Sequence, residues 1–416
     1  MIIVYRILTI IIFLFVPLIL LWRLFRKKEI LNSSKEKIAF IRKRRNKGKL
    51  IWFHGASVGE IKSIIPLVEI YQKRSDIKTI LLTSNTLSSA KILSEIKSKK
   101  IIHQFFPLDL NLFVKKFLNY WKPATACFVD SEIWPNMIFE LKKRKIPILI
   151  LNGRVTEKSF KKWKFFPSFS KEIFSKIDLC LSSSKETVNF LKKLGAKKVK
   201  FIGNLKFTQS EHKIRNIENN LKIFTKSKKV WCASSTHHNE EYICGTIHKK
   251  LKKIHKNLLT IIIPRHIESV ESIKEDLERI GLNVHVHAPR KKINMNTDIY
   301  LVNVYGKTKS FYANCNNVFL GGSLVNHGGQ NPLEAAIYGC NIMHGKYVHN
   351  FKEIYTFLKQ NQIAHLTTNY DKLTSKLNFF LSNKKISKNK LENKIDIIGS
   401  KILENTKKEL NFYLNK

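Results

Sequence analysis

The chain has 416 residues, more than one hydrophobic core usually supports, so we expect two domains. Its 75 Lys and Arg residues against 31 Asp and Glu residues give a formal net charge of +44, which suits a polyanionic partner such as nucleic acid or an anionic membrane surface. The basic residues are spread along the whole chain, with no arginine-rich recognition block and no base-stacking motif, and this argues against a nucleic-acid-binding protein.

Residues 1–28 contain an uncharged, almost wholly apolar run from Ile7 to Trp22, flanked by basic residues on both sides. No small-residue cleavage site follows the run, so we expect a retained membrane anchor and not a removed signal peptide. The run has 16 residues, which is short for a full span, and whether it spans the bilayer or lies in its interface stays open. The basic cluster after it predicts that the rest of the chain is cytoplasmic.

From Lys49 onward, apolar runs alternate with amphipathic stretches, which predicts mainly parallel sheets covered by helices. The expected strands are 50–54, 78–83, 101–105, 124–129, 146–151, 177–182, 199–202, 229–233, 258–263, 283–286, 298–302, 316–320 and 340–343. A polar interval at 208–228 predicts a linker, so the domains are expected at 29–207 and 229–416, the second closing with Lys-rich helical material from residue 384.

The first candidate site follows the first of these strands, in the sequence IWFHGASVGE at 51–60. It reads as a strand, a tight glycine turn and a helix start that bears a carboxylate, Glu60. Glu60 is either a general base beside unpaired helix N–H groups or, as acidic residues in first turns usually are, only a favourable charge at the helix dipole.

Polar residues also follow other predicted strands of the first half, at 83–86, 130–136, 152–154 and 203–207. The segment 130–136, DSEIWPN, has two carboxylates and a tryptophan before a proline-started helix, more than a helix start requires. Arg154 is equally an anion ligand or a solvated charge, and Lys206 is singled out only by its position at a strand end.

In the second half, Pro264-Arg265-His266 directly follows a strand, and an arginine held there suits a phosphate. Two glycine-rich loops, GGSL at 321–324 and HGGQNPLE at 327–334, lead into a helix. Backbone N–H groups, a helix dipole and Glu334 predict a site for a phosphate and a ribose.

The cysteine and histidine patterns predict no metal site. The six cysteines are scattered without CxxC pairs, so buried, reduced thiols in a cytosolic protein are expected. His237-His238 and His285-x-His287 have no Cys or Asp cluster nearby.

Together these motifs resemble those of the 3-deoxy-D-manno-octulosonic acid (Kdo) transferases, which attach Kdo to lipid A. The matching segments are SVGE (57–60), DSEIWPN (130–136), NGRVTEKS (152–159), GNLKF (203–207), STHHNEE (235–241), PRH (264–266) and GGSLVNHGGQNPLEAA (321–336). The resemblance extends from the N-terminal anchor to near the C-terminus.

The resemblance implies an α/β GT-B glycosyltransferase fold, with two Rossmann-like doubly wound domains facing a central cleft and an N-terminal membrane-anchor helix at 1–28. It implies an acceptor-binding domain at 29–207 and a CMP-sugar-binding domain at 229–416, joined by the linker 208–228. The implied reaction is an inverting transfer of Kdo from CMP-Kdo to the lipid A precursor lipid IVA, in lipopolysaccharide core biosynthesis. No metal, cofactor or nucleic acid is expected, and the implied location is the cytoplasmic side of the inner membrane.

The resemblance also implies roles for individual residues. Glu60 matches the family's catalytic base, and Asp130 and Lys206 match positions that stabilise the transition state. The predicted substrate-binding residues are Pro264, Arg265, Tyr305, Gly306, Lys307, Asn331, Pro332, Leu333 and Glu334 at the CMP, together with Ser57, Gly322 and Ser323. The chemistry agrees, because an inverting transfer needs one base, and cationic side chains can meet the growing charge on the leaving phosphate.

The sequence departs from the family's pattern at several positions. Asp130 stands where glutamate is usual, Ser88-Ser89 where glycine is usual, and Gln330 where histidine is common. Tyr305-Gly306-Lys307 replaces a usual Met-Gly-Glu, which reverses a charge beside the nucleotide.

Two other hypotheses stay open. A GT-B transferase for a different nucleotide sugar would retain the motifs of the second half, although the full series of motifs argues against it. A non-enzymatic, membrane-tethered polyanion-binding protein is favoured only by the charge.

Overall fold

The computed structural model describes residues 1–416 except 27–28, 97, 209–216, 290, 384–387 and 416. The chain forms two compact units, Met1–Gln209 with Gly399–Lys416, and Ser210–Ile398. Each contains a seven-stranded sheet in which every pairing is parallel.

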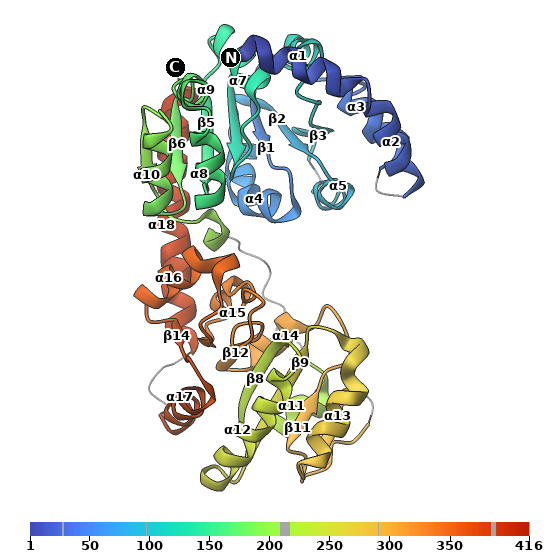
Figure 1. The fold of residues 1–416 in the computed structure, drawn as a ribbon, viewed down its shortest axis with the longest axis vertical. Helices are drawn as coiled ribbons and strands as arrows, with labels where there is room; N and C mark the ends of the chain where they lie inside the picture. The colour runs from blue at the N-terminus through green and yellow to red at the C-terminus, as the bar shows by residue number, and fades with distance from the viewer. Residues whose placement is uncertain (27–28, 97, 209–216, 290, 384–387, 416) are drawn as a thin grey trace. The chain divides into compact units, whose positions relative to one another are not determined.

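The sheet of the first unit has the strand order β3-β2-β1-β4-β5-β6-β7. Its strands are β1 (Lys49–His54), β2 (Ile77–Ser84), β3 (Ile101–Phe105), β4 (Thr125–Val129), β5 (Ile148–Gly153), β6 (Leu179–Ser182) and β7 (Val199–Phe201). The helices are α1 (Ile2–Phe13), α2 (Val16–Phe25), α3 (Leu31–Lys37), α4 (Val58–Gln72), α5 (Leu87–Ser94), α6 (Asn111–Trp121), α7 (Pro135–Lys143), α8 (Glu157–Lys164), α9 (Pro167–Phe174), α10 (Lys185–Lys193) and the 3-10 turn η1 (Leu205–Thr208). The helix α3 lies beside the edge strand β3 (Figure 1).

The sheet of the second unit has the order β10-β11-β9-β8-β12-β13-β14. Its strands are β8 (Lys229–Thr236), β9 (Leu258–Pro264), β10 (Val284–Val286), β11 (Ile299–Leu301), β12 (Asn317–Leu320), β13 (Asn341–His344) and β14 (Ala364–Leu366). The helices are α11 (Asn219–Thr225), α12 (Glu240–Ile254), η2 (Ile267–Ser269), α13 (Val270–Arg279), α14 (Thr308–Asn314), α15 (Leu333–Ile337), η3 (His349–Phe351), α16 (Lys352–Gln360), α17 (Tyr370–Ser382) and α18 (Lys388–Leu414), which continues into the first unit.

Both sheets are doubly wound, so each has a point where the strand order reverses. The reversal lies at the neighbours β1 and β4 in the first unit and at β8 and β12 in the second. Ligands of open parallel sheets bind outside the carboxyl ends of the strands at such points. The motifs SVGE and DSEIWPN follow β1 and β4, and STHHNEE and GGSL follow β8 and β12.

Apolar strand residues pack under helices on both sheets and hold the motifs in place. In the first unit, Trp52 of β1 and Phe128 of β4 are buried in the core with Trp121 of α6. In the second, Trp231 of β8 and Phe319 of β12 are likewise buried in the core, on the two neighbouring strands at which the strand order reverses. All six cysteines are buried thiols, as expected for core residues.

Every predicted strand overlaps an observed one, but three features differ from the prediction. The short edge strand β14 was not predicted. The helix α11 lies within the predicted linker and buries Leu221, whereas residues 209–216 of that linker lie outside the described residues. The segment Gly399–Lys416 was assigned to the second domain, yet it packs in the first unit, where the Tyr71 hydroxyl donates to Asn411 Oδ1 over 3.0 Å.

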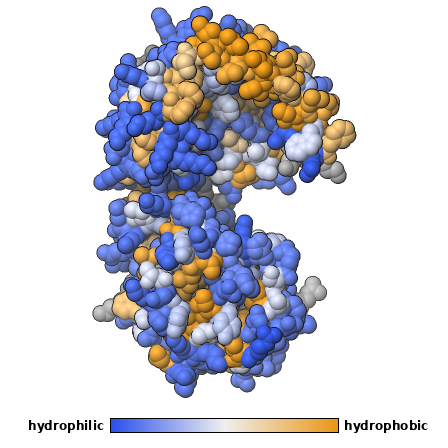
Figure 2. Space-filling view, viewed as in Figure 1, coloured by the Kyte–Doolittle hydropathy of each residue, from blue (hydrophilic) through white to orange (hydrophobic). Residues whose placement is uncertain are grey.

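The apolar N-terminal run forms two helices and not the single helix that was predicted. Pro17 lies in the first turn of α2, and α1 and α2 are bent by 49° at the break. Among the described residues, no single helix is long and apolar enough to cross a membrane, whereas this bent pair passes that test of length and composition together. Figure 2 shows the apolar surface that the pair presents, and its exposed side chains include Ile3, Ile10, Leu14, Phe15, Leu18 and Phe25.

Candidate active site

The carboxylate of Glu60 is folded back over the turn that precedes its helix. Its Oε2 accepts a hydrogen bond from the Ala56 N–H over 2.8 Å, and its Oε1 accepts from the Ser57 hydroxyl over 2.8 Å. A side chain at Gly55 would place its Cβ 3.1 Å from Glu60 Cβ, so glycine leaves the room that this conformation needs. Glu60 therefore does help to cap the helix, while its side chain stays partly exposed.

Burial raises the pKa of Glu60, and the charge of Glu132 raises it further. The hydrogen bonds from Ser57 and Ala56 and the neighbouring His54 act in the opposite direction without cancelling the effect. A carboxylate with a raised pKa is a stronger base than a solvated one, which suits proton abstraction near neutral pH.

A second carboxylate, Glu132, lies close to Glu60 and was not among the predicted site residues. Its Oε2 lies 3.2 Å from His54 Nε2 and accepts from the Trp134 indole N–H over 2.8 Å. Burial alone would raise the pKa of Glu132, but these two hydrogen bonds and the neighbouring His54 together lower it. Glu132 is therefore held in its charged form beside the candidate base.

His54 is the residue that orients this carboxylate. It is fully buried at the end of β1, its Nδ1 lies 2.9 Å from Thr83 Oγ1, and its ring stacks on Phe106 at 3.9 Å between centroids. The second carboxylate of DSEIWPN and a histidine at the end of a strand were the available signals, but nothing in the sequence indicates that the two side chains meet.

Asp130 and Lys206 are both held by their backbones at strand ends. Asp130 has a left-handed φ of 65°, and its carbonyl accepts from the Arg154 N–H over 3.3 Å. The Lys206 turn, η1, packs on α4, the helix of Glu60, and Asn152 Oδ1 accepts from the Leu205 N–H over 2.9 Å. The motifs SVGE, DSEIWPN, NGR and GNLKF thus lie at the carboxyl ends of β1, β4, β5 and β7, along one edge of the first sheet.

In the second unit, the amides of the loop GGSL are already hydrogen-bonded to a side chain. The buried carboxylate of Glu240 accepts from the N–H groups of Gly322, Ser323 and Leu324 over 2.6, 3.2 and 3.0 Å, and from the His237 N–H over 3.0 Å. The expectation that these amides cradle a phosphate is therefore wrong for this structure. Gly322 and Ser323 stay predicted substrate-binding residues without that role.

The other predicted nucleotide-binding residues differ in how far their side chains are available. Those of Arg265, Tyr305, Asn331 and Glu334 are exposed, whereas Pro332 and Leu333 are buried. The Tyr305 hydroxyl donates to Glu268 Oε1 over 3.3 Å, and the ammonium of Lys307 forms an ion pair with Glu218. This pairing offsets the positive charge that distinguishes Lys307 from the family's usual glutamate.

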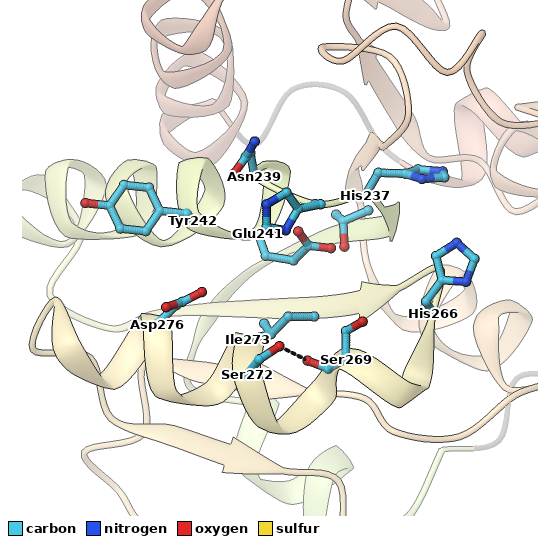
Figure 3. A pocket seen from close by; sticks show the side chains of 11 residues that line it. His237, Asn239, Glu241, Tyr242, His266, Ser269, Ser272, Ile273 and Asp276 are labelled. Carbon is cyan, nitrogen blue, oxygen red and sulfur yellow. Dashed lines mark hydrogen bonds between the residues drawn. The ribbon is translucent and has the colours of Figure 1, made fainter.

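A pocket of about 230 Å³ lies at the carboxyl ends of β8 and β9 (Figure 3). Its wall includes His237, Glu241 and Tyr242 around the start of α12, and His266 and Ser269 at the start of α13. Burial raises the pKa of Glu241, and burial together with His327 lowers the pKa of His237. The pocket adjoins the PRH motif, but of the predicted substrate-binding residues none lines it.

No group of three or more His, Cys, Asp or Glu side chains that could hold a metal ion occurs in the part of the chain that the structure describes. The cationic side chains of the motifs are the positive groups at hand for an anionic ligand. They include Arg154 and Lys206 in the first unit and Arg265 in the second.

Residues 32–209 match the family model described as 3-deoxy-D-manno-octulosonic-acid transferase (kdotransferase). The chain is 32% identical over 409 residues to a 3-deoxy-D-manno-octulosonic acid transferase of Rickettsia bellii, with 97% of this chain and 96% of that protein covered. It is 33% identical to the protein of that name in Rickettsia felis, with 88% and 78% covered. A solved structure of a putative UDP-N-acetylglucosamine 2-epimerase from Listeria monocytogenes shares the fold over 88% of this chain and 97% of that one, with a TM-score of 0.57 at 13% identity.

Proposed function

We propose that this chain, which belongs to the 3-deoxy-D-manno-octulosonic acid (Kdo) transferase family, transfers Kdo from CMP-Kdo to a lipid A precursor in lipopolysaccharide biosynthesis. The observation that carries the proposal is the match to the Rickettsia bellii enzyme over 97% of the chain. The position of Glu60, at the reversal point of a parallel sheet, supports it. In this proposal the two parallel-sheet units are the acceptor and donor domains of a GT-B transferase.

Glu60 acts as the general base of an inverting transfer. It takes the proton from the acceptor hydroxyl as that oxygen bonds to the anomeric carbon of Kdo and the bond from that carbon to the CMP phosphate oxygen breaks. The raised pKa of Glu60 supports this role, since it strengthens the carboxylate as a base. The negative charge of Glu132, held by His54 and Trp134, contributes to that shift.

The leaving group is a cytidine monophosphate, whose negative charge grows as the bond breaks. Lys206 and the exposed Arg265 are the proposed cationic partners of that charge. Asp130 keeps the role that its family position implies, which is to stabilise the transition state together with Lys206. Asn331 and Glu334 are the proposed polar contacts to the nucleotide. Lys307 is ion-paired with Glu218, so we assign it to positioning its own loop and not to the phosphate.

The enzyme is proposed to work at the cytoplasmic face of the inner membrane, anchored by its N-terminus. The exposed apolar side chains of α1 and α2 support this location, and so does the basic charge of the chain near an anionic surface. The acceptor is itself a membrane glycolipid, which gives an anchored enzyme direct access to it.

The test is to incubate the purified full chain in detergent with CMP-Kdo and lipid IVA and to measure the masses of the lipid products. We expect a mass increase of one or more Kdo units. In Glu60→Gln we expect a loss of about a thousandfold or more in rate. Glu69→Gln is the matched control, because Glu69 is an exposed carboxylate on the same helix.

No Kdo-bearing product from the folded parental protein would overturn the proposal, and the same assay with other nucleotide sugars would then test the alternative transferase. Parental rates in Glu60→Gln would overturn the assignment of the base while leaving the reaction standing.

A further inference from the structure

The first unit contains a cavity of about 160 Å³ between its bent N-terminal helices and its body. One wall is formed by Ile12, Phe13 and Val16, which flank the break between α1 and α2. The opposite wall is formed by Leu108 and Leu110 after β3 and by Trp134 after β4. The cavity therefore lies at the same edge of the sheet as the DSEIWPN motif.

The polar groups on the wall of this cavity already have partners elsewhere. The Tyr5 hydroxyl donates to Asp109 Oδ2 over 2.9 Å, and Asp109 also accepts from the N–H groups of Asn136 and Met137 over 3.0 and 2.9 Å. The Thr9 hydroxyl donates to the Arg6 carbonyl over 2.9 Å. The interior therefore offers its occupant an almost wholly apolar surface, which suits a hydrocarbon chain and not a sugar or a phosphate.

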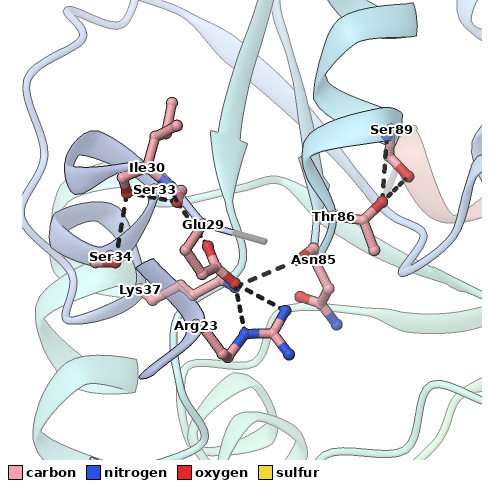
Figure 4. Close-up of polar contacts among 9 residues, drawn as sticks. All are labelled: Arg23, Glu29, Ile30, Ser33, Ser34, Lys37, Asn85, Thr86 and Ser89. Atoms are coloured by element: carbon pink, nitrogen blue, oxygen red, sulfur yellow. Dashed lines mark hydrogen bonds and ion pairs between the residues drawn. The ribbon is translucent and has the colours of Figure 1, made fainter. Parts of the chain in front are cut away.

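The helices that form one wall are held firmly on the body of the unit. Arg6 Nε donates to Asn136 Oδ1 over 3.1 Å, and its guanidinium lies 3.6 Å from Glu140. At the other end, Arg23 and Lys37 pair with the buried carboxylate of Glu29 (Figure 4). These contacts fix the cavity as part of the folded unit.

The outer face of the same helices is apolar and exposed, as Figure 2 shows. Leu14 and Phe15, at the break itself, are 71% and 58% exposed. The cavity wall and this exposed surface therefore belong to the same two helices, and both are apolar.

Trp134 connects the cavity to the candidate base. Its ring forms part of the cavity wall while its indole N–H donates to Glu132, whose charge acts on Glu60. An occupant of the cavity thus lies one side chain away from the polar cluster at which the acceptor hydroxyl is deprotonated in the proposed reaction.

We infer that the cavity bounded by α1, α2 and the loops after β3 and β4 binds a fatty acyl chain of the acceptor lipid and so positions the acceptor sugar at Glu60. This inference rests on the proposed function, and it adds an acyl-chain site and a reason for the bend in the N-terminal helices. The occupant is the acyl chain of the acceptor itself and not that of a bulk membrane lipid.

The test compares two acceptors, lipid IVA and the same phosphorylated disaccharide with all acyl chains removed, using the full chain in detergent. The double variant Thr9→Phe with Val16→Phe fills the cavity. The matched control is Ile10→Phe with Ile19→Phe, because these two exposed residues lie on the same helices outside the cavity.

We expect the filled variant to raise KM for lipid IVA by about tenfold, as the loss of contact with roughly two methylene groups predicts, with kcat for the deacylated acceptor unchanged. The control should match the parent with both acceptors. Equal effects on both acceptors, or no effect on KM for lipid IVA, would overturn the inference. The inference would also be overturned if the parental protein had the same KM for lipid IVA and for the deacylated acceptor.

A binding measurement separates this inference from the proposed reaction. A brominated fatty acyl glycolipid should quench the fluorescence of Trp134 without any CMP-Kdo, and Trp134→Phe should remove that component. Quenching without any transfer of Kdo would contradict the proposed function but not the apolar site. Transfer of Kdo by the parental protein without this quenching would contradict the acyl-chain site but not the proposed function.

Discussion

At the scale of single residues, the candidate site is a pair of carboxylates with opposite pKa shifts. Burial raises the pKa of Glu60, whereas hydrogen bonds from His54 and Trp134 lower the pKa of Glu132. One group is thereby prepared to accept a proton while the other keeps its charge. The sequence pointed to Glu60 through its turn, but the partnership with Glu132 depends on a contact between two separate strand ends.

This arrangement predicts opposite effects of two neighbouring substitutions on the pH profile. Ser57→Ala removes a hydrogen bond that favours the charged form of Glu60, so the pKa of Glu60 rises and the acidic limb of kcat/KM moves to higher pH. Glu132→Gln removes a repelling charge, so the limb moves to lower pH. Profiles of kcat/KM against pH for the parent and both variants measure the shifts. If the acidic limb moved in the same direction in both variants, this would contradict the assignment of that limb to Glu60.

Glu240 is expected to contribute to stability and not directly to chemistry. Its buried carboxylate accepts from four backbone N–H groups, and a glutamine there would face some of those donors with its own NH₂ group. We expect Glu240→Gln to lower the free energy of unfolding of the second unit by about 3 kcal/mol. Urea denaturation measures this, with the exposed Glu271→Gln as control; equal stability of the two variants would refute the role.

At the scale of elements, the alternation of apolar strands and amphipathic helices was enough to predict both parallel sheets. It did not predict β14, because three residues at a sheet edge carry no pattern, nor α11, whose buried Leu221 stands in a polar interval. It also could not assign the end of α18, since a Lys-rich amphipathic helix fits either sheet equally well.

The attachment of the N-terminal segment depends on the ion cluster around Glu29. The Glu29 side chain is 1% exposed and pairs with Arg23 and Lys37, and Lys37 also donates to the Asn85 carbonyl over 3.3 Å. Burial opposes ionisation, but the hydrogen bonds from Lys37, Ser33 and Arg23 outweigh it and lower the pKa of Glu29. Asn85 in turn donates its N–H to the Ala56 carbonyl beside Glu60 over 3.4 Å, which links the cluster to the candidate base.

The lowered pKa gives the stability contribution of Glu29 a definite pH dependence. It is fully present above the ordinary glutamate value, because the unfolded carboxyl is then already charged, and it is lost as pH falls through the lower folded value. We expect Glu29→Gln to cost about 2 kcal/mol of unfolding free energy near neutral pH and progressively less in acid. Denaturation in detergent across this range measures the difference, with the exposed Glu95→Gln as control; a cost that grows on acidification would contradict the assigned shift.

At the scale of the whole molecule, two surface properties bear on where the enzyme works. The net charge of +44 attracts an anionic membrane over a distance, and this attraction is screened by salt. The exposed apolar side chains of α1 and α2 act only on contact, and their burial in lipid is insensitive to salt. A protein anchored as proposed should therefore show both components of binding, and they should be separable.

We expect the full chain to bind vesicles that contain phosphatidylglycerol more tightly than vesicles of phosphatidylcholine, and this preference should fade between about 0.1 M and about 1 M salt, as the Debye length falls from about 10 Å to about 3 Å. The binding that remains at high salt is the apolar component. Phe15→Asp with Leu18→Asp, two exposed positions on the bent pair, should abolish it, whereas Ile223→Asp, at an exposed apolar residue of the second unit, should not. Co-flotation with vesicles measures each case. At high salt the electrostatic attraction is screened, so any remaining binding is apolar. Undiminished high-salt binding by the double variant would therefore mean that the N-terminal helices are not the anchor.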